Sequence, residues 1–102
     1  MVVGTLYNKI YKITRKNILY NSLEFFNGNR NVNAKNVQRL IEAIKERNLL
    51  PICPLLVYYI DGVYKIVDGQ HRYTAALELR LPFYIVILKE PYDITLIGRL
   101  NS

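Results

Sequence analysis

The sequence predicts a single small domain of the α/β (α+β) class, in which a mixed sheet packs against about three helices. Three observations predict it: an amphipathic helix pattern from Ala34, a hairpin signal at residues 61–62, and a helix pattern between two strand patterns over residues 63–88. The chain has 102 residues, is 51% hydrophobic and 22% charged, and so has the length and composition of one domain with a true core. We therefore expect one domain over residues 1–102.

The first part of the chain begins with an alternating segment. Residues 7–13 place tyrosine, lysine, tyrosine and isoleucine on one side, which predicts a strand with one exposed face. Two short apolar pieces follow, over residues 18–20 and 23–26, and we expect both to be extended segments that pack on the core. The Asn-Gly-Asn sequence of residues 27–29 is a turn signal.

One clear amphipathic helix follows this turn. Asn33 is placed to cap a helix that begins at Ala34, and apolar residues then recur at spacings of three and four. Pro51 cannot continue a helix, so the helix should end near Asn48.

A β-hairpin is predicted in the second half. Residues 55–60 have the length and residue types of a strand, and Asp61-Gly62 is a strong two-residue turn signal. Residues 63–67 then form the antiparallel partner strand.

A strand–helix–strand unit completes the predicted fold. Residues 70–79 read as a helix and residues 83–88 as a buried strand, while a last short helix is expected near Pro91. A right-handed crossover would make the strands of residues 63–67 and 83–88 parallel.

Composition excludes several classes of protein. No apolar run approaches the roughly 18–20 residues of a membrane span, and we expect no signal peptide. One cysteine, Cys53, and one histidine exclude a disulfide framework within the chain and a Cys-rich or His-cluster metal site, so no metal site is expected. The predicted compartment is the reducing cytoplasm, and Cys53 is expected to be a small core residue away from the functional motif.

The positive charge lies in the first half of the chain. The net charge is +6; residues 1–50 carry nine Lys/Arg and three Asp/Glu, and residues 51–102 carry five of each. This balance suggests an anionic partner. The densest basic run is expected to contact the phosphate backbone of a nucleic acid; it consists of Lys9, Lys12, Arg15 and Lys16. The alternative is an edge strand that its lysines keep soluble.

The segment from Asp68 to Arg72 carries the candidate chemistry, because a strand runs into a glycine turn and a helix begins immediately. Free N–H groups and the positive end of the helix dipole make such a start a natural phosphate site. His71 and Arg72 lie one turn before Ala75-Ala76, so they should point toward the protein body and add two donors. In the alternative, Arg72 pairs with Asp68 or caps a carbonyl, and His71 is a satisfied buried donor.

The string Asp68-Gly69-Gln70-His71-Arg72 (DGQHR), with the helix and proline after it, resembles the ParB/sulfiredoxin superfamily. More narrowly, it resembles the ParB-like nuclease domains (the N-terminal ParB domain) of phages and mobile elements. The order of Asn29-Arg30, Asn33, an amphipathic helix and a hairpin extends the resemblance to about residues 7–100. It implies a pocket that binds a nucleotide or phosphate through Gly69, Gln70, His71 and Arg72, with Arg30 on the opposite wall.

The resemblance also implies candidate ligands and partners. Sulfiredoxins use ATP, partition proteins bind CTP, and other members are nucleases, so the candidate cofactor is a nucleoside triphosphate with Mg²⁺ and the candidate partner is DNA. Gln70 stands where a sulfiredoxin needs its catalytic cysteine, which argues against that activity. Arg80 stands where relatives commonly have glycine, and we expect a different C-terminal helix cap there.

Two hypotheses remain open. In the first, the domain binds a nucleotide or nucleic-acid phosphate at Gly69–Arg72 and acts on or with DNA, as a nuclease or a nucleotide hydrolase if it is an enzyme. His71 would then be the general acid–base, Arg72 and Arg30 would stabilise phosphoryl charge, and Asp68 would orient His71 or hold a divalent ion. In the second, the domain is a non-catalytic module of viral type that binds a host or structural protein. Because phage-type relatives continue further, we expect either a chain cut from a longer protein at its C-terminus, with any oligomer formed through the missing part, or a minimal stand-alone version of the domain.

Overall fold

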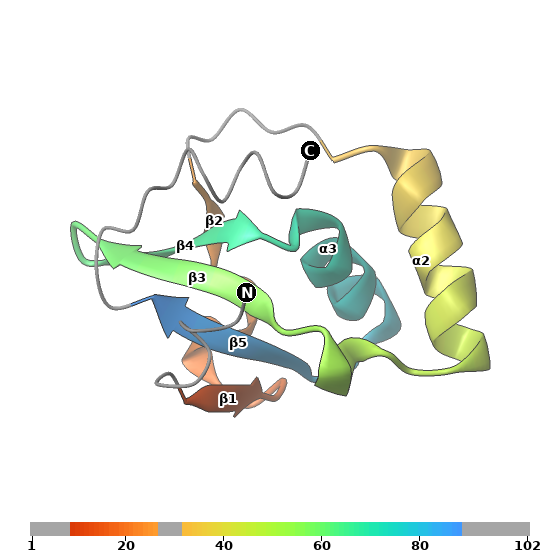
Figure 1. Ribbon diagram of the computed structural model, residues 1–102, viewed down its shortest axis with the longest axis horizontal. Coiled ribbons are helices and arrows are strands. Elements are labelled where there is room, and N and C mark those ends of the chain that lie inside the picture. Colours follow the sequence, from red (N-terminus) through yellow and green to blue (C-terminus); the bar gives the residue numbers. More distant parts are fainter. Residues whose placement is uncertain (1–8, 27–31, 89–102) are drawn as a thin grey trace.

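A mixed five-stranded sheet is the base of the fold in the computed structural model, which describes residues 9–26 and 32–88 (Figure 1). Across the sheet the strands follow the order β1-β5-β3-β4-β2. The β3–β4 and β1–β5 pairs are antiparallel, whereas the β3–β5 and β2–β4 pairs are parallel. The strands are β1 (Ile10–Ile13), β2 (Glu24–Phe25), β3 (Leu55–Ile60), β4 (Val63–Asp68) and β5 (Phe83–Leu88).

The predicted hairpin is confirmed. Asp61 and Gly62 join β3 to β4, and both have a positive φ, 53° and 79°. Two positive φ values match the right-handed twist of the flanking strands, which is why an Asp-Gly pair favours this turn. The turn fixes the register, so that Tyr59 lies opposite Tyr64.

The direction of β5 differs from the prediction. β5 runs parallel to β3 and therefore antiparallel to β4, on the other side of β3. The helix that connects β4 to β5 stays at the end of the sheet where β4 ends, so the chain re-enters the sheet from that same end (Figure 1). The crossover therefore links the parallel strands β3 and β5, with β4 as part of the connection.

Two α-helices form in the described part of the chain, α2 (Ala34–Glu46) and α3 (Gln70–Leu79). Asn33 caps α2 as predicted, because its side-chain oxygen accepts hydrogen bonds from the N–H groups of Lys35 (2.8 Å) and Asn36 (3.2 Å). Neither described helix is long and apolar enough to cross a membrane. The helix expected near Pro91, the turn at residues 27–29 and the start of the first strand lie outside the described residues.

Two single-turn 3₁₀ helices complete the described chain, η1 (Ile18–Asn21) and η2 (Leu50–Ile52). The prediction of an extended segment at residues 18–20 is therefore wrong. Asn17 explains the difference, because its side chain accepts a hydrogen bond from the N–H of Leu19 at 2.8 Å and caps a helical turn.

The core lies where α3 packs between the sheet and α2 (Figure 1). Ala75 and Ala76 are 0% exposed, so the face of α3 that was predicted to pack closely does so. Their small side chains let the helix approach the sheet. The largest fully buried side chains of the core are Phe83, Leu50, Leu55, Ile66, Ile85, Val57 and Val86.

The C-terminus of α3 ends in a left-handed cap. Arg80 has a φ of 57°, and the N–H of Leu81 donates to the carbonyl of Ala76 at 3.0 Å. This is the pairing that glycine usually provides at a helix end, here made by an arginine. The expectation of a different cap at Arg80 is therefore wrong.

Two buried tyrosines tie this helix end to η1. The hydroxyl of Tyr20 donates to the carbonyls of Leu81 (2.7 Å) and Ala76 (3.3 Å), while the hydroxyl of Tyr73 donates to the carbonyl of Tyr20 at 3.0 Å. Both rings also pack on Phe83. Burial raises the pKa of Tyr20 and of Tyr73 above the usual value of 10.0; the positive charge of Arg15 opposes the rise at Tyr20.

Removal of the Tyr20 hydroxyl should destabilise the domain. In Tyr20→Phe the carbonyls of Leu81 and Ala76 lose a buried donor, and we expect a loss of about 1–2 kcal/mol in the free energy of unfolding, measured by urea titration. Tyr11→Phe is the matched control, because Tyr11 is 44% exposed and should change by less than about 0.5 kcal/mol. Equal effects of the two variants would contradict this account.

Stability should fall at alkaline pH. Because the folded-state pKa values of Tyr20 and Tyr73 lie above 10.0, the stability that these groups contribute is complete below pH 10.0 and is lost as pH rises through the raised values. We expect the free energy of unfolding to decline above about pH 10, with a smaller decline in Tyr73→Phe. An unchanged alkaline slope in that variant would argue against the assignment.

A candidate phosphate pocket at the start of helix α3

The passage from β4 into α3 depends on Gly69. Its φ of +109° is a conformation that side chains rarely adopt. A Cβ there would lie 2.6 Å from Cδ2 of Leu55 and 2.9 Å from Nη2 of Arg72. Any larger residue would therefore be strained at this φ and would force the side chain of Leu55 or of Arg72 to move.

The first turn of α3 presents unpaired backbone donors. The first hydrogen bond within the helix runs from the N–H of Tyr73 to the carbonyl of Gly69 at 2.9 Å. The N–H groups of the three residues between them have no partner inside the helix, and no described side chain caps this end. The positive end of the helix dipole adds to the attraction for an anion.

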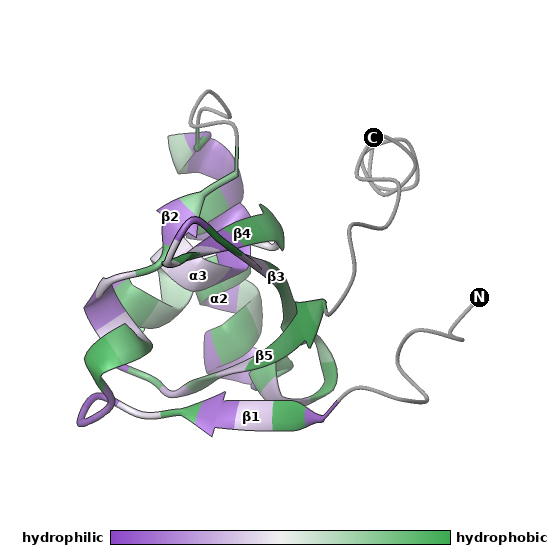
Figure 2. Cartoon of the chain, turned by 90° about the vertical axis from the view of Figure 1, so that its left-hand side faces the viewer, coloured by the Kyte–Doolittle hydropathy of each residue, from purple (hydrophilic) through white to green (hydrophobic). Residues whose placement is uncertain are grey.

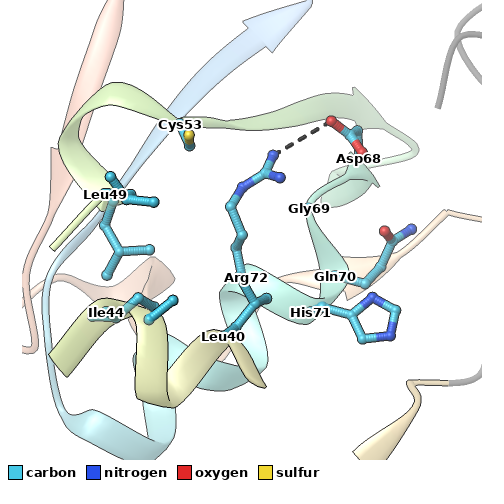
Figure 3. A pocket seen from close by; sticks show the side chains of 11 residues that line it. Leu40, Ile44, Leu49, Cys53, Asp68, Gly69, Gln70, His71 and Arg72 are labelled. Carbon is cyan, nitrogen blue, oxygen red and sulfur yellow. Dashed lines mark hydrogen bonds and ion pairs between the residues drawn. The ribbon is translucent and has the colours of Figure 1, made fainter. Parts of the chain in front are cut away.

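A cavity of about 340 Å³ lies beside this helix start (Figure 3). One wall is apolar and comes from the second half of α2, from η2 and from the residues around them. The other wall is polar and consists of the five motif residues. The cavity, which we call the α3-start pocket, is lined by Leu40, Ala43, Ile44, Leu49, Leu50, Cys53, Asp68, Gly69, Gln70, His71 and Arg72.

The guanidinium of Arg72 lies between the two walls (Figure 3). Its Nη2 donates to the carbonyl of Pro54 at 3.2 Å and to Oδ2 of Asp68 at 3.4 Å. Both structural roles that were left open for Arg72 are thus present together. Its Nε is buried and has no hydrogen-bond partner among the described residues. Because buried donors in proteins are almost always paired, this unpaired N–H is an exception that calls for a partner.

His71 points away from Arg72 (Figure 3). Its Nε2 accepts a hydrogen bond from the backbone N–H of Asn33 at 3.0 Å, which joins the starts of α2 and α3. Nε2 is therefore occupied by a contact within the fold. Asp68 faces Arg72 in this structure, and no described contact links Asp68 to His71.

Gln70 and Cys53 also line the pocket. Gln70 is 8% exposed, the one buried polar residue in the described core. Cys53 lies in the pocket wall near Arg72, so the expectation that it stands away from the motif is wrong (Figure 3). The turn of η2 brings it there, and sequence spacing holds no signal for that placement.

The other predicted site residues do not line the pocket. The basic run follows the edge of the sheet: Lys9 directly precedes β1, Lys12 lies on β1, and Arg15 and Lys16 lie in the turn after it. All four residues are exposed. Arg30 lies outside the described residues. Within residues 9–26 and 32–88, no group of three or more His, Cys, Asp or Glu side chains gathers as a metal site would require.

Solved structures of three proteins share this fold. The C-terminally truncated chromosome-partitioning protein ParB from Caulobacter crescentus, complexed with CTP-γ-S, matches 91% of the chain with a TM-score of 0.67 and 21% identity. Sulfiredoxin from Arabidopsis thaliana matches 90% with a TM-score of 0.59 and 24% identity, and C-terminally truncated SbnI from Staphylococcus aureus matches 88% with a TM-score of 0.61 and 17% identity.

The share of each relative that is covered differs. The chain spans 52% of the C. crescentus structure and 34% of SbnI, but 97% of the sulfiredoxin. No protein with a curated description matches the sequence. The sequence profile of the ParB N-terminal domain matches residues 6–98, nearly the whole chain, and agrees with the fold. The chain therefore belongs to the ParB N-terminal domain family.

Proposed function

We propose that this ParB-like domain binds a nucleotide in the α3-start pocket and works together with DNA. The observation that carries the proposal is the buried, unpartnered Nε of Arg72 beside the free N–H groups of the first turn of α3. Donors of these two kinds converge on one cavity, and phosphate oxygens are the acceptors that match them.

The two walls of the pocket favour a nucleotide over a free phosphate. Leu40, Ile44, Leu49 and Leu50 form an apolar surface opposite the polar helix start. A base and its sugar would cover that surface while the phosphates meet the N–H groups. The cavity of about 340 Å³ is also of the size that small-ligand sites have.

Asp68 fits a further role when the ligand carries Mg²⁺. Magnesium in nucleotide sites is commonly held by one or two carboxylates together with the phosphates. Asp68 is the carboxylate of the pocket lining, and its side chain is 26% exposed, so an oxygen can face the ligand. Its ion pair with Arg72 would then be shared with the bound phosphates.

A structural relative supports the choice of ligand. The C. crescentus ParB structure, which has the same fold, was solved with CTP-γ-S. Gln70 and His71 line the pocket beside Arg72, and their predicted contact with phosphate stays a prediction. The basic residues of β1 and its turn would supply the contact with DNA, on a surface separate from the pocket.

The geometry favours binding over hydrolysis. A general base must have a free nitrogen, and the Nε2 of His71 is occupied by the N–H of Asn33. Asp68 faces Arg72 and so does not orient the imidazole. Nuclease or nucleotidase activity and a phage origin remain predictions from the sequence motif alone.

Nucleoside triphosphates should stabilise the domain. We expect the melting temperature to rise with CTP or another nucleoside triphosphate in a thermal-shift panel of mono-, di- and triphosphates, each with and without Mg²⁺. A ligand at 100 times its dissociation constant stabilises the folded state by about 2.7 kcal/mol, which raises the melting temperature of a domain of this size by about 10–20 °C. Inorganic phosphate alone should have a smaller effect, since it leaves the apolar wall uncovered. A flat panel would favour the alternative of a protein-binding module.

The guanidinium of Arg72 should be needed for nucleotide affinity. Arg72→Lys keeps the charge but removes the Nε donor and the planar fork of the guanidinium. We expect the affinity for the nucleotide to fall at least ten-fold, which is about 1.4 kcal/mol of binding free energy. Arg39→Lys, the same change on the exposed face of α2, is the control. Isothermal titration of both variants, with a melting curve of each, separates lost binding from lost folding. Equal affinity of the two variants would exclude Arg72 as a ligand contact.

A further inference from the structure

A second basic hollow lies at the opposite end of α3 from the proposed nucleotide pocket. It has a volume of about 310 Å³, and we call it the α3-end hollow. It is lined by Arg15, Tyr20, Asn21, Leu77 and Arg80. Arg15 comes from the turn after β1, which Figure 2 shows as a hydrophilic segment, and Arg80 from the helix cap. Ten residues separate the two ends of α3, which is about 15 Å of helix.

Arg80 occupies a backbone position that disfavours it. Its φ of 57° belongs to the left-handed region, where a Cβ crowds the carbonyl and glycine is the favoured residue. The guanidinium of Arg80 has no ion pair among the described residues, where Arg72–Asp68 is the one salt bridge. The left-handed backbone serves the helix cap, whereas the exposed guanidinium makes no described ion pair and is available to a ligand.

The charges around the α3-end hollow are of one sign. Arg15 and Arg80 are the two charged residues that line it, and both are positive. Like charges at one hollow repel each other, and an anion between them would remove that cost. Asn21 adds an amide that can donate to the same anion.

We propose that Arg15, Asn21 and Arg80 bind a phosphate group, and that this phosphate belongs to the backbone of a nucleic acid. Arg15 is part of the basic run with Lys12 and Lys16, so a chain of phosphates could follow the run and end at the hollow. The inference rests on the DNA-binding part of the proposed function and is independent of the α3-start pocket. It adds Arg80, which the sequence placed only at a helix end, to the nucleic-acid surface.

Arg80→Gly is the decisive variant, because it should change stability and binding in opposite directions. Glycine relieves the left-handed strain, so the melting temperature should rise or stay unchanged. Affinity for a short DNA duplex, measured by fluorescence anisotropy, should fall by at least three-fold. The slope of log affinity against log salt should decrease by about 0.9, as expected for the loss of one phosphate contact. A purely structural role of Arg80 would produce neither binding effect.

Matched variants complete the experiment. Arg15→Gln should weaken DNA binding to a similar degree, Arg80→Lys should retain part of the affinity, and Lys45→Gln, on the exposed face of α2, should have little effect. A further outcome is that Arg80→Gly loses the stabilisation by pyrophosphate that the unchanged protein shows, and yet keeps its affinity for DNA. That result would support a phosphate site at the hollow but would overturn its assignment to nucleic acid. Unchanged responses to both DNA and pyrophosphate overturn the proposal.

The two sites can be tested separately. Arg80→Gly should keep the melting-temperature shift with nucleoside triphosphates, and Arg72→Lys should keep its affinity for DNA. A nucleotide panel without any stabilisation would therefore not contradict the proposed phosphate site at the α3-end hollow. An Arg80→Gly variant with unchanged DNA affinity would likewise not contradict nucleotide binding in the α3-start pocket.

Discussion

The close approach of Gly69 to Leu55 and Arg72 is the constraint on which the rest of the site depends. Because Gly69 has no Cβ, its backbone can adopt a left-handed conformation and connect β4 directly to α3. The helix therefore begins directly after the end of β4, and its first residues line the cavity. The same step places the guanidinium of Arg72 over the glycine, within reach of Asp68 and Pro54. A longer connection would separate the backbone donors from the arginine.

The contact between His71 and Asn33 holds the second wall of the pocket against the first. Asn33 caps α2 with its side chain and donates its own N–H to Nε2 of His71. The starts of the two helices are thus fixed to each other by one residue from each side. The apolar residues further along α2 then face the start of α3 at a set distance. The described contact of His71 is therefore one within the fold, and it sets the position of one helix start relative to the other.

Local signals explain what the sequence could predict. Asn33 accepts hydrogen bonds from the first N–H groups of α2, and Asp61 and Gly62 adopt the positive φ values of the hairpin turn. The cap of α2 and the hairpin therefore follow from neighbouring residues alone. The direction of β5 could not be predicted in this way, because it depends on whether the strand adds beside β3 or β4. Arg72 was placed in the right region by helical spacing. Its simultaneous contact with Asp68 and Pro54 requires η2, whose path brings Cys53 and Pro54 to the motif and has no counterpart in the sequence pattern.

The two ends of α3 impose opposite electrostatic conditions on the two proposed phosphate sites. At the start of α3, the positive end of the helix dipole favours an anion. One arginine, Arg72, is then enough for the proposed anion site, although Asp68 neutralises part of its charge. At the end, the dipole is negative and would repel an anion. The hydroxyl of Tyr20 donates to the last carbonyls and reduces that repulsion, but a net attraction still needs more than one cation. Arg80 alone would only offset the dipole, so the site requires Arg15 from the basic half of the chain. Part of the surplus positive charge of residues 1–50, the guanidinium of Arg15, therefore lies beside Arg80, which comes from the half of the chain without net charge.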